Sequence, residues 1–305
     1  MSGRDVTLET AVGSVSLRTC VVTASGTAGH GAELAEYGEL DTLGAIVTKS
    51  LSSFAWAGNP APRVAPAGDD MINAVGLAGP GVLAWREHGL RELREHGATV
   101  VGSIWGRSTE EFADAANAMR GADITALEIN ASCPNLEARN AIFANSPEAT
   151  AELVRACGAT GLPLWVKLTL TAPDLIDVAT AALEAGAEAL VVGNTLTGMV
   201  LDPDTGRPVL GNGGGGVSGR SLLPIATRAI YDIRRALPSA PIIGIGGVWS
   251  GQDALTLISA GANVVGVGTA SLASPRAPWK IQREIARWLK KHETSLDAVR
   301  GRAHG

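Results

Sequence analysis

The most chemically reactive side chain in a polar setting is the thiol of Cys133, in the segment LEINASCPN at residues 127–135. The segment begins as an apolar run and then presents two amides, Asn130 and Asn135, on either side of the cysteine. Two flanking amides can grip a planar polar ligand, and a thiol with an ordinary pKa of about 8.5 can remove a proton where the site favours thiolate. A nucleophilic role is also open, although no histidine lies nearby in the sequence to activate the sulfur.

Two lysines stand at or near the ends of apolar runs. Lys49 follows AIVT, and Lys167 lies within LWVKL. Burying an unpaired ammonium group is costly, so each lysine is expected to face an anionic partner, such as a carboxylate or a phosphorylated, electron-rich ring. The alternative is that either lysine extends to water or pairs with an acid such as Glu128.

Two glycine-rich turns follow neighbouring apolar runs, GIGG at 244–247 and GVGT at 266–269. Their backbone N–H groups, beside the start of a helix, would form an anion site of the kind that binds phosphate in barrels. For either turn alone, an ordinary structural turn is as good an interpretation as a phosphate site, but the pair on adjacent strands favours phosphate. Neither turn has the G-x-G-x-x-G spacing, so a nicotinamide site is not expected.

The elements that position these residues alternate along the chain. Near-continuous apolar runs are typical of strands buried on both faces. The predicted strands span 21–24, 45–48, 100–104, 126–130, 164–168, 189–193, 242–245 and 264–267. The predicted helices span 86–96, 109–119, 147–158, 173–185, 221–236, 251–260 and about 276–291. Ser108, Ser146 and Ser250 supply helix-start signals.

Eight strand–helix units in a chain of this length predict an α/β fold, a single (β/α)8 TIM barrel over residues 1–305. A doubly wound open sheet is the alternative, and the count of eight and the lack of a linker favour the barrel. Residues 6–18 predict a β-hairpin at the bottom of the barrel. The connections 49–85 and 194–220 are long and carry no predicted element, which indicates a functional role at the carboxyl ends of the strands.

Composition excludes several other classes of protein. The 305 residues are 46% apolar and 18% charged, with a net charge of −5 and no Lys/Arg block, so no nucleic-acid partner is expected. No apolar run is long enough for a membrane span, and the first ten residues have no signal-peptide core. The three cysteines form no C-x-x-C or Cys/His cluster, so no metal site or disulfide is expected, and Cys20 and Cys157 fit small apolar core residues. We therefore expect a cytoplasmic protein.

In these residues the chain resembles the class 1 dihydroorotate dehydrogenases, flavin-dependent TIM-barrel oxidoreductases of pyrimidine biosynthesis. The resemblance runs from about Val21 to Pro275, and it is most similar to the catalytic subunit of subclass 1B. No single motif establishes the resemblance, but the order and spacing of nine motifs together are specific to the family. The motifs are ASGTAGHG, GNPAPR, MINAVGLAGPG, EINASCPN, WVKL, NTLTG, GGVSG, IIGIGGV and VGVGTA.

The resemblance implies that Cys133 is the catalytic base, which removes the C5 proton of dihydroorotate while a hydride passes from C6 to FMN. The residues implied for FMN are Ser25, Lys49, Ser50, Asn130, Lys167, Gly219, Gly246, Gly247, Gly268 and Thr269. We also expect Ser103 and Gly193 to border the cofactor, at positions where the family has an asparagine and a larger apolar residue. The residues implied for dihydroorotate are Lys49, Asn73, Val75, Gly76, Leu77, Asn130, Asn135, Asn194 and Thr195.

Partners and departures follow from the same resemblance. Subclass 1B implies a homodimer core in a heterotetramer with a subunit that carries FAD and a 2Fe-2S cluster and reduces NAD⁺. A homodimer that reduces fumarate directly is the alternative. Arg139 and Asn140 stand where the family has a Gly-Gly pair, which puts the substrate range in doubt. A dihydropyrimidine or dihydrouracil dehydrogenase-like reaction and a catalytically silent binding barrel are the competing functions, and Asn135 favours dihydroorotate.

Overall fold

The computed structural model of the protein describes residues 6–132 and 143–305. Eight parallel strands form one sheet, and nearly every residue in them is buried, as their continuous apolar runs predict. In chain order they are β3 (Val21–Thr23), β4 (Ile46–Val47), β7 (Val100–Ile104), β8 (Ala126–Asn130), β9 (Leu164–Leu168), β10 (Ala189–Val192), β13 (Ile242–Ile245) and β14 (Val264–Val267).

The sheet closes into a barrel. Its strand order is β3-β14-β13-β10-β9-β8-β7-β4, so β3 and β4 stand at the two ends of the order. These two strands meet through a parallel bridge between Val22 and Ala45, and the backbone N–H of Thr23 donates to the carbonyl oxygen of Ala45 at 3.1 Å. The predicted TIM barrel is confirmed, and the open-sheet alternative is wrong.

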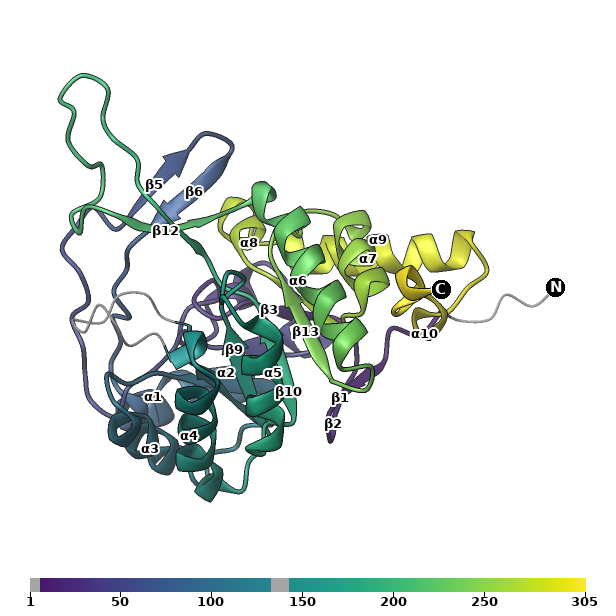
Figure 1. Cartoon of the computed structure of the whole chain (residues 1–305), viewed down its shortest axis with the longest axis horizontal. Coiled ribbons are helices and arrows are strands. Elements are labelled where there is room, and N and C mark those ends of the chain that lie inside the picture. Colours follow the sequence, from purple (N-terminus) through teal and green to yellow (C-terminus); the bar gives the residue numbers. More distant parts are fainter. Residues whose placement is uncertain (1–5, 133–142) are drawn as a thin grey trace.

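Helices follow most of the strands and surround the barrel (Figure 1). Three of them begin at the predicted serines, whose hydroxyls accept backbone N–H groups of the first turn, as N-cap residues do. The predicted helix 86–96 is instead two short helices that meet at His88. The helices are α1 (Val82–Glu87), α2 (Gly89–Glu95), α3 (Thr109–Ala118), α4 (Pro147–Cys157), α5 (Leu175–Glu184), α6 (Leu223–Ala236), α7 (Gly251–Ala260), α8 (Thr269–Ala273), α9 (Ala277–Lys291) and α10 (Leu296–Val299).

An antiparallel hairpin covers the amino-terminal end of the barrel, as predicted. It consists of β1 (Thr10–Val12) and β2 (Val15–Leu17). Alternate side chains of a strand point to opposite faces, so every second residue of the barrel strands faces the interior. Val12, Val15 and Leu17 pack against the inward residues at this end, which we call the apolar layer. Its members are Val22, Ala45, Val47, Val101, Ala126, Trp165, Ala189, Val191, Ile243 and Val264.

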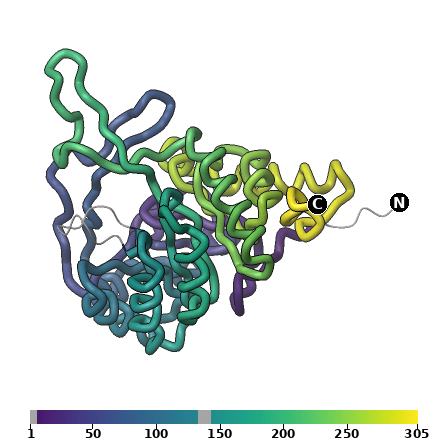
Figure 2. The backbone as a smooth tube through the Cα atoms, viewed as in Figure 1, coloured from purple at the N-terminus to yellow at the C-terminus, as the bar shows by residue number. Residues whose placement is uncertain are grey.

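The two long connections are not without secondary structure, which corrects the expectation from sequence. They supply β5 (Val64–Ala67), β6 (Asp70–Asn73), β11 (Leu196–Gly198) and β12 (Gly215–Ser218), which pair in an antiparallel sheet of order β11-β12-β6-β5. The sequence signal is weak because glycine and proline interrupt the strand pattern. This sheet lies at the end of the barrel opposite to the β1–β2 hairpin (Figure 1), and both connections project from that end (Figure 2).

Candidate active site

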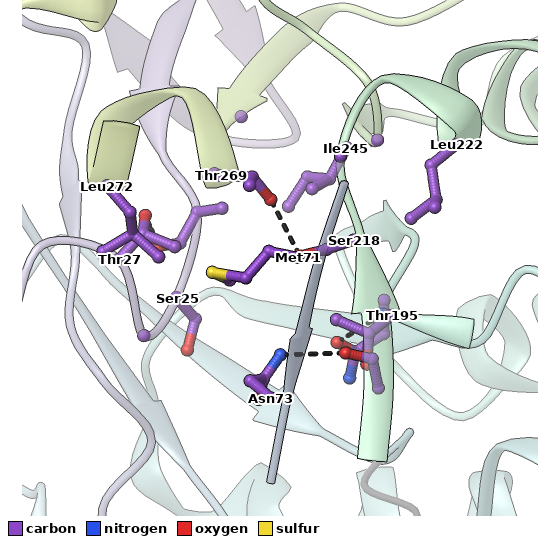
Figure 3. Close-up of a pocket in the computed structure, with 18 of the residues that line it drawn as sticks. Ser25, Thr27, Met71, Asn73, Thr195, Ser218, Leu222, Ile245, Thr269 and Leu272 are labelled. Carbon is purple, nitrogen blue, oxygen red and sulfur yellow. Dashed lines mark hydrogen bonds between the residues drawn. The ribbon is translucent and has the colours of Figure 1, made fainter. Parts of the chain in front are cut away.

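A pocket with a cavity volume of about 280 Å³ opens at the carboxyl ends of the barrel strands. Loops from different strands and the four-stranded sheet line it together (Figure 3). It brings together 17 of the residues that the sequence predicts for the site. These are Ser25, Lys49, Ser50, Asn73, Val75, Gly76, Leu77, Asn130, Lys167, Gly193, Asn194, Thr195, Gly219, Gly246, Gly247, Gly268 and Thr269. Cys133 and Asn135 lie outside the described residues, as do Arg139 and Asn140.

One wall of the pocket is the four-stranded sheet. Asn73 ends β6, and its Nδ2 donates to the carbonyl oxygen of Gly216 on β12 at 3.2 Å. A Cβ atom at Gly216 would lie 2.0 Å from Oγ1 of Thr195, so only glycine allows β12 to pass this close to the strand-end residues. Pairing between the two long connections is therefore what carries Asn73 and Thr195 to the same site.

Several lining residues were missed by sequence reasoning. Met71 and Ser218 lie on the four-stranded sheet, and Oγ1 of Thr269 donates to Oγ of Ser218 at 2.8 Å (Figure 3). Met71 stands two residues before Asn73, so strand periodicity could have found it had β6 been predicted. Val64 and Leu272 also line the pocket, although each side chain is half exposed. Their apolar type alone carries no signal for a binding site.

The floor of the pocket is a set of hydrogen-bonded polar side chains. Nδ2 of Asn130 donates to Oγ of Ser50 at 3.0 Å, and Oγ of Ser132 donates to Oδ1 of Asn130 at 3.2 Å. Nδ2 of Asn194 donates to Oγ of Ser132 at 2.8 Å. These contacts link the ends of β4, β8 and β10, so the two amides hold fixed orientations in the free protein. Such fixed donors and acceptors suit a planar polar ligand.

Ser103 does not line the pocket. Its side chain is fully buried beneath the floor, and its Oγ contacts Oγ of Ser50 at 2.9 Å and Oγ of Ser25 at 3.3 Å. The same Oγ donates to Oε1 of Glu128 at 2.8 Å. Ser103 thus reaches the pocket through two serines that do line it, and its part in binding a cofactor remains a prediction.

The two lysines enter the pocket from different strands. Lys167, near the end of β9, is 4% exposed, and within residues 6–132 and 143–305 no carboxylate lies at ion-pair distance from it. Glu128, the acid considered as its partner, instead accepts the hydrogen bond from Ser103. Lys49 follows β4 and lies near His30, whose pKa is lowered by burial first and by the charge of Lys49 second. A buried ammonium group at the floor favours an anionic or electron-rich ligand.

The glycine turns combine structural and site roles. Gly246 and Gly247 have φ angles of 135° and 74°, and a Cβ at Gly247 would lie 2.4 Å from the backbone nitrogen of Leu223 at the start of α6. An ordinary structural reason for these two glycines therefore exists. Gly268 differs, because a Cβ there would approach nothing closer than 3.5 Å. Gly268 lines the pocket, so its backbone can contact a ligand there.

The two cysteines that the structure describes lie in the core, away from the pocket. Cys20 and Cys157 are fully buried, and burial raises the pKa of each thiol to about 12. The prediction that both are small apolar core residues is confirmed. Across the described residues, no group of three His, Cys, Asp or Glu side chains is arranged to hold a metal ion. In the same part of the chain, no helix has both the length and the apolar character needed to span a bilayer.

Comparison with known proteins gives a consistent result. The family model described as dihydroorotate dehydrogenase matches residues 7–289. The catalytic subunit of dihydroorotate dehydrogenase B (NAD(+)) from Geobacter sp. strain M21 is 40% identical over 287 residues, which cover 93% of this chain and 94% of the relative. The subunit of the same name from Trichlorobacter lovleyi is 41% identical over 280 residues, 91% and 92% of the two chains. That from Alkaliphilus metalliredigens is 37% identical over 298 residues, 97% and 98% of the two chains.

Proposed function

The chain belongs to the dihydroorotate dehydrogenase family, and we propose that it oxidises dihydroorotate to orotate in pyrimidine biosynthesis as a flavin-dependent oxidoreductase. The observation that carries the proposal is the pocket at the strand ends, in which two lysines and three asparagines converge. The relatives named above all bear the dihydroorotate dehydrogenase name, and they lend no support to a dihydropyrimidine dehydrogenase or to a silent barrel.

The family is flavin-dependent, and we propose FMN as the cofactor of this chain. The pocket fits it, because Lys167 is buried without an acidic partner among the described residues and Gly268 leaves room for close approach. Gly246, Gly247, Gly268 and Thr269 would hold the phosphate. Residues from other strand ends would hold the ring, namely Ser25, Lys49, Ser50, Asn130, Lys167, Gly193 and Gly219, with Ser103 behind them. When bound, FMN supplies the hydride acceptor.

The chain's own residues would bind the substrate and move its proton. Cys133, outside the described residues, is proposed as the base that removes the C5 proton, in the segment that directly follows β8. The ammonium of Lys49 would pair with the substrate carboxylate, a charge-assisted contact. The amides and backbone groups around the pocket would hold the ring. They belong to Asn73, Val75, Gly76, Leu77, Asn130, Asn135, Asn194 and Thr195.

The name "catalytic subunit" of the relatives supports a second kind of chain in the assembly. We propose a homodimer core with a partner that carries FAD and a 2Fe-2S cluster and passes electrons to NAD⁺. The described residues contain no cysteine cluster for such a centre. A suitable docking place is the edge of the pocket where Val64 and Leu272 expose 52% and 50% of their surface. The single domain over residues 1–305 and the cytoplasmic location remain predictions.

The central experiment is the absorbance spectrum of the purified protein before and after anaerobic addition of dihydroorotate. Flavin bands should be present and should bleach on addition of dihydroorotate. NAD⁺ reduction should require the partner chain. Heme, a metal chromophore or no chromophore after incubation with FMN would contradict the cofactor, and unbleached flavin would contradict the substrate.

Alanine variants of two lysines, one in the pocket and one outside it, test the placement of the substrate. Lys49→Ala should weaken orotate binding and slow flavin reduction, each by well over twofold, because the ammonium group pairs with the carboxylate. Lys290→Ala, on α9 away from the pocket, is the matched control and should leave both unchanged. If both quantities in Lys49→Ala stay within twofold of the parent, Lys49 has a structural role instead.

A further inference from the structure

Glu128 is a buried acid that the proposed reaction does not use. It lies at the centre of β8, one inward position above Ala126 of the apolar layer and one below Asn130 of the pocket floor. Its side chain is 1% exposed, and among the described residues it accepts a hydrogen bond that Oγ of Ser103 donates at 2.8 Å. Burying a carboxylate is costly, so a role is expected at this position. In this bond the side-chain oxygen Oε1 of Glu128 is the acceptor and the hydroxyl of Ser103 is the donor.

The acceptor Glu128 determines how Ser103 bonds to its other neighbours. A hydroxyl offers one donor and two acceptor sites, and the single proton of Ser103 is committed to Glu128. The contacts with Ser50 at 2.9 Å and Ser25 at 3.3 Å must therefore be made by Ser103 as an acceptor. Oγ of Ser25 also contacts Oγ of Ser50 at 3.3 Å, and because the proton of Ser50 goes to Ser103, Ser25 is the donor in that contact as well. Both serines, which line the pocket, therefore direct their protons inward.

The same direction continues along the floor. Ser50 donates to Ser103 and accepts from Nδ2 of Asn130 at 3.0 Å. Oδ1 of Asn130 accepts from Ser132 at 3.2 Å, and Ser132 accepts from Nδ2 of Asn194 at 2.8 Å. The bonds form one chain from Asn194 to the carboxylate, and every bond has the same polarity. Hydrogen bonds in such a chain reinforce one another in a low-dielectric interior.

We propose that Glu128 is a positioning residue that sets the hydrogen-bond polarity of the pocket floor. With the carboxylate as the final acceptor, Ser25 and Ser50 offer the pocket oxygen acceptor sites and no proton, although Ser50 already accepts one bond from Asn130. Asn130 faces it with the amide N–H that is not bonded to Ser50. The floor then selects a ligand edge that carries an N–H or O–H donor beside a carbonyl acceptor, a pattern that FMN offers. The inference rests on the proposed function, since it concerns how that cofactor is held.

Replacement of Glu128 by glutamine tests the polarity with little change in volume. A glutamine side chain has both an acceptor (Oε1) and a donor (Nε2), so it no longer enforces one polarity; the chain can reverse, and the serines can present protons to the pocket. We expect Glu128→Gln to bind FMN about 10–100-fold more weakly, the range for loss of a hydrogen bond to a charged group. Dissociation constants would be measured by quenching of FMN fluorescence on titration with cofactor-free protein, with near-UV circular dichroism as the check on folding.

Ser103→Ala breaks the same chain one bond closer to the pocket and should weaken FMN binding by a similar factor. If both residues act through one chain, the double variant should bind no more than about threefold more weakly than the weaker single variant. The absorption bands of bound FMN should shift in both single variants. Thr23→Val is the matched control, because Thr23 on β3 has a fully buried hydroxyl that bonds to the backbone of Val47 and not to the floor.

The outcomes are distinguishable. If Glu128→Gln has the same FMN affinity and flavin bands as the parent, the inference is overturned. It is also overturned if the double variant loses FMN affinity by the product of the two single losses, because the two residues would then act independently. Weakening in Thr23→Val as large as in Glu128→Gln would reduce the effect to general loss of packing and overturn it too. If Glu128→Gln does not fold, the FMN affinity of Ser103→Ala is compared with that of Thr23→Val. An equal loss in the two variants would overturn the inference. A parent protein that binds no FMN at all would contradict the proposed cofactor itself, and with it this inference.

Discussion

The interior of the barrel has an apolar half and a polar half, and the same strands contribute residues to both. At the amino-terminal end β7, β8 and β9 contribute Val101, Ala126 and Trp165 to the apolar layer. One or two inward positions further along, the same strands contribute Ser103, Glu128, Asn130 and Lys167, which we call the polar layer. All four polar residues are at most 6% exposed. The change occurs within five residues of each strand.

The contrast indicates that one end of each strand contributes to stability and the other end to ligand binding. Buried polar and charged groups cost stability unless they are fully paired, and Lys167 is not paired with an acid among the described residues. Packed apolar side chains supply the free energy that offsets this cost. We therefore expect changes in the apolar layer to act on stability and changes in the polar layer to act on ligands. Four experiments test that division, and the largest effect comes first.

The largest expected effect is on catalysis at the pocket and not on stability. Cys133→Ala should slow reduction of the flavin by dihydroorotate about 10²–10⁴-fold, the usual cost of losing a general base. FMN and orotate binding and the thermal midpoint should stay close to those of the parent. Stopped-flow absorbance measures the reduction rate. Near-normal reduction would identify another residue as the base, and a lower thermal midpoint would mean that Cys133 contributes to stability as well as to catalysis.

The largest expected effect on stability is in the apolar layer. Trp165→Ala should lower the free energy of unfolding by about 3–5 kcal/mol, because a fully buried indole leaves a cavity. Urea unfolding of the cofactor-free protein measures it without the contribution of ligand binding. Trp288→Ala, at a half-buried tryptophan on the outer helix α9, is the control and should cost less. Equal losses would mean that the apolar layer contributes no more than the outer surface.

Lys167 is the next inward residue after Trp165 on β9, and its replacement should affect ligand binding instead of stability. Lys167→Met should weaken FMN binding at least tenfold, while the cofactor-free protein keeps or gains stability because a buried ammonium is replaced by an apolar chain. Fluorescence titration and urea unfolding measure the two quantities on the same preparation. Lys280→Met, at an exposed lysine on α9, should change neither. A loss of stability with unchanged affinity would assign Lys167 to the structural half.

The smallest expected effect is a pH dependence at the pocket end. Burial, and then the charge of Lys49, lower the pKa of His30 from its ordinary 6.5, and Glu33 opposes them. The unfolded chain then binds more protons than the folded one below pH 6.5, so stability falls as pH falls through that range. The slope between pH 7 and pH 5.5 should be smaller in His30→Asn. Equal slopes in the parent and the variant would remove His30 as the cause.

Sequence by itself determined the barrel and most of the site's membership. Continuous apolar runs mark strands that are buried on both faces, and serines such as Ser108 mark where helices begin. A polar residue at the end of such a run, as at Asn130, can only lie at the rim of the sheet. Since parallel strands share their carboxyl ends, local pattern was enough to predict that Lys49, Lys167 and Asn194 meet.

Only the tertiary structure decided which long-range pairs form. The strand β12 is GGVS, too rich in glycine to signal a strand, and it exists because Gly216 pairs with Asn73, 143 residues away. Ser103 likewise reads as a pocket residue from its strand, yet its hydroxyl lies below the floor and bonds to Glu128. A sequence states which polar groups are available. The partner that each buried donor finds depends on distances across the barrel, which no local pattern contains.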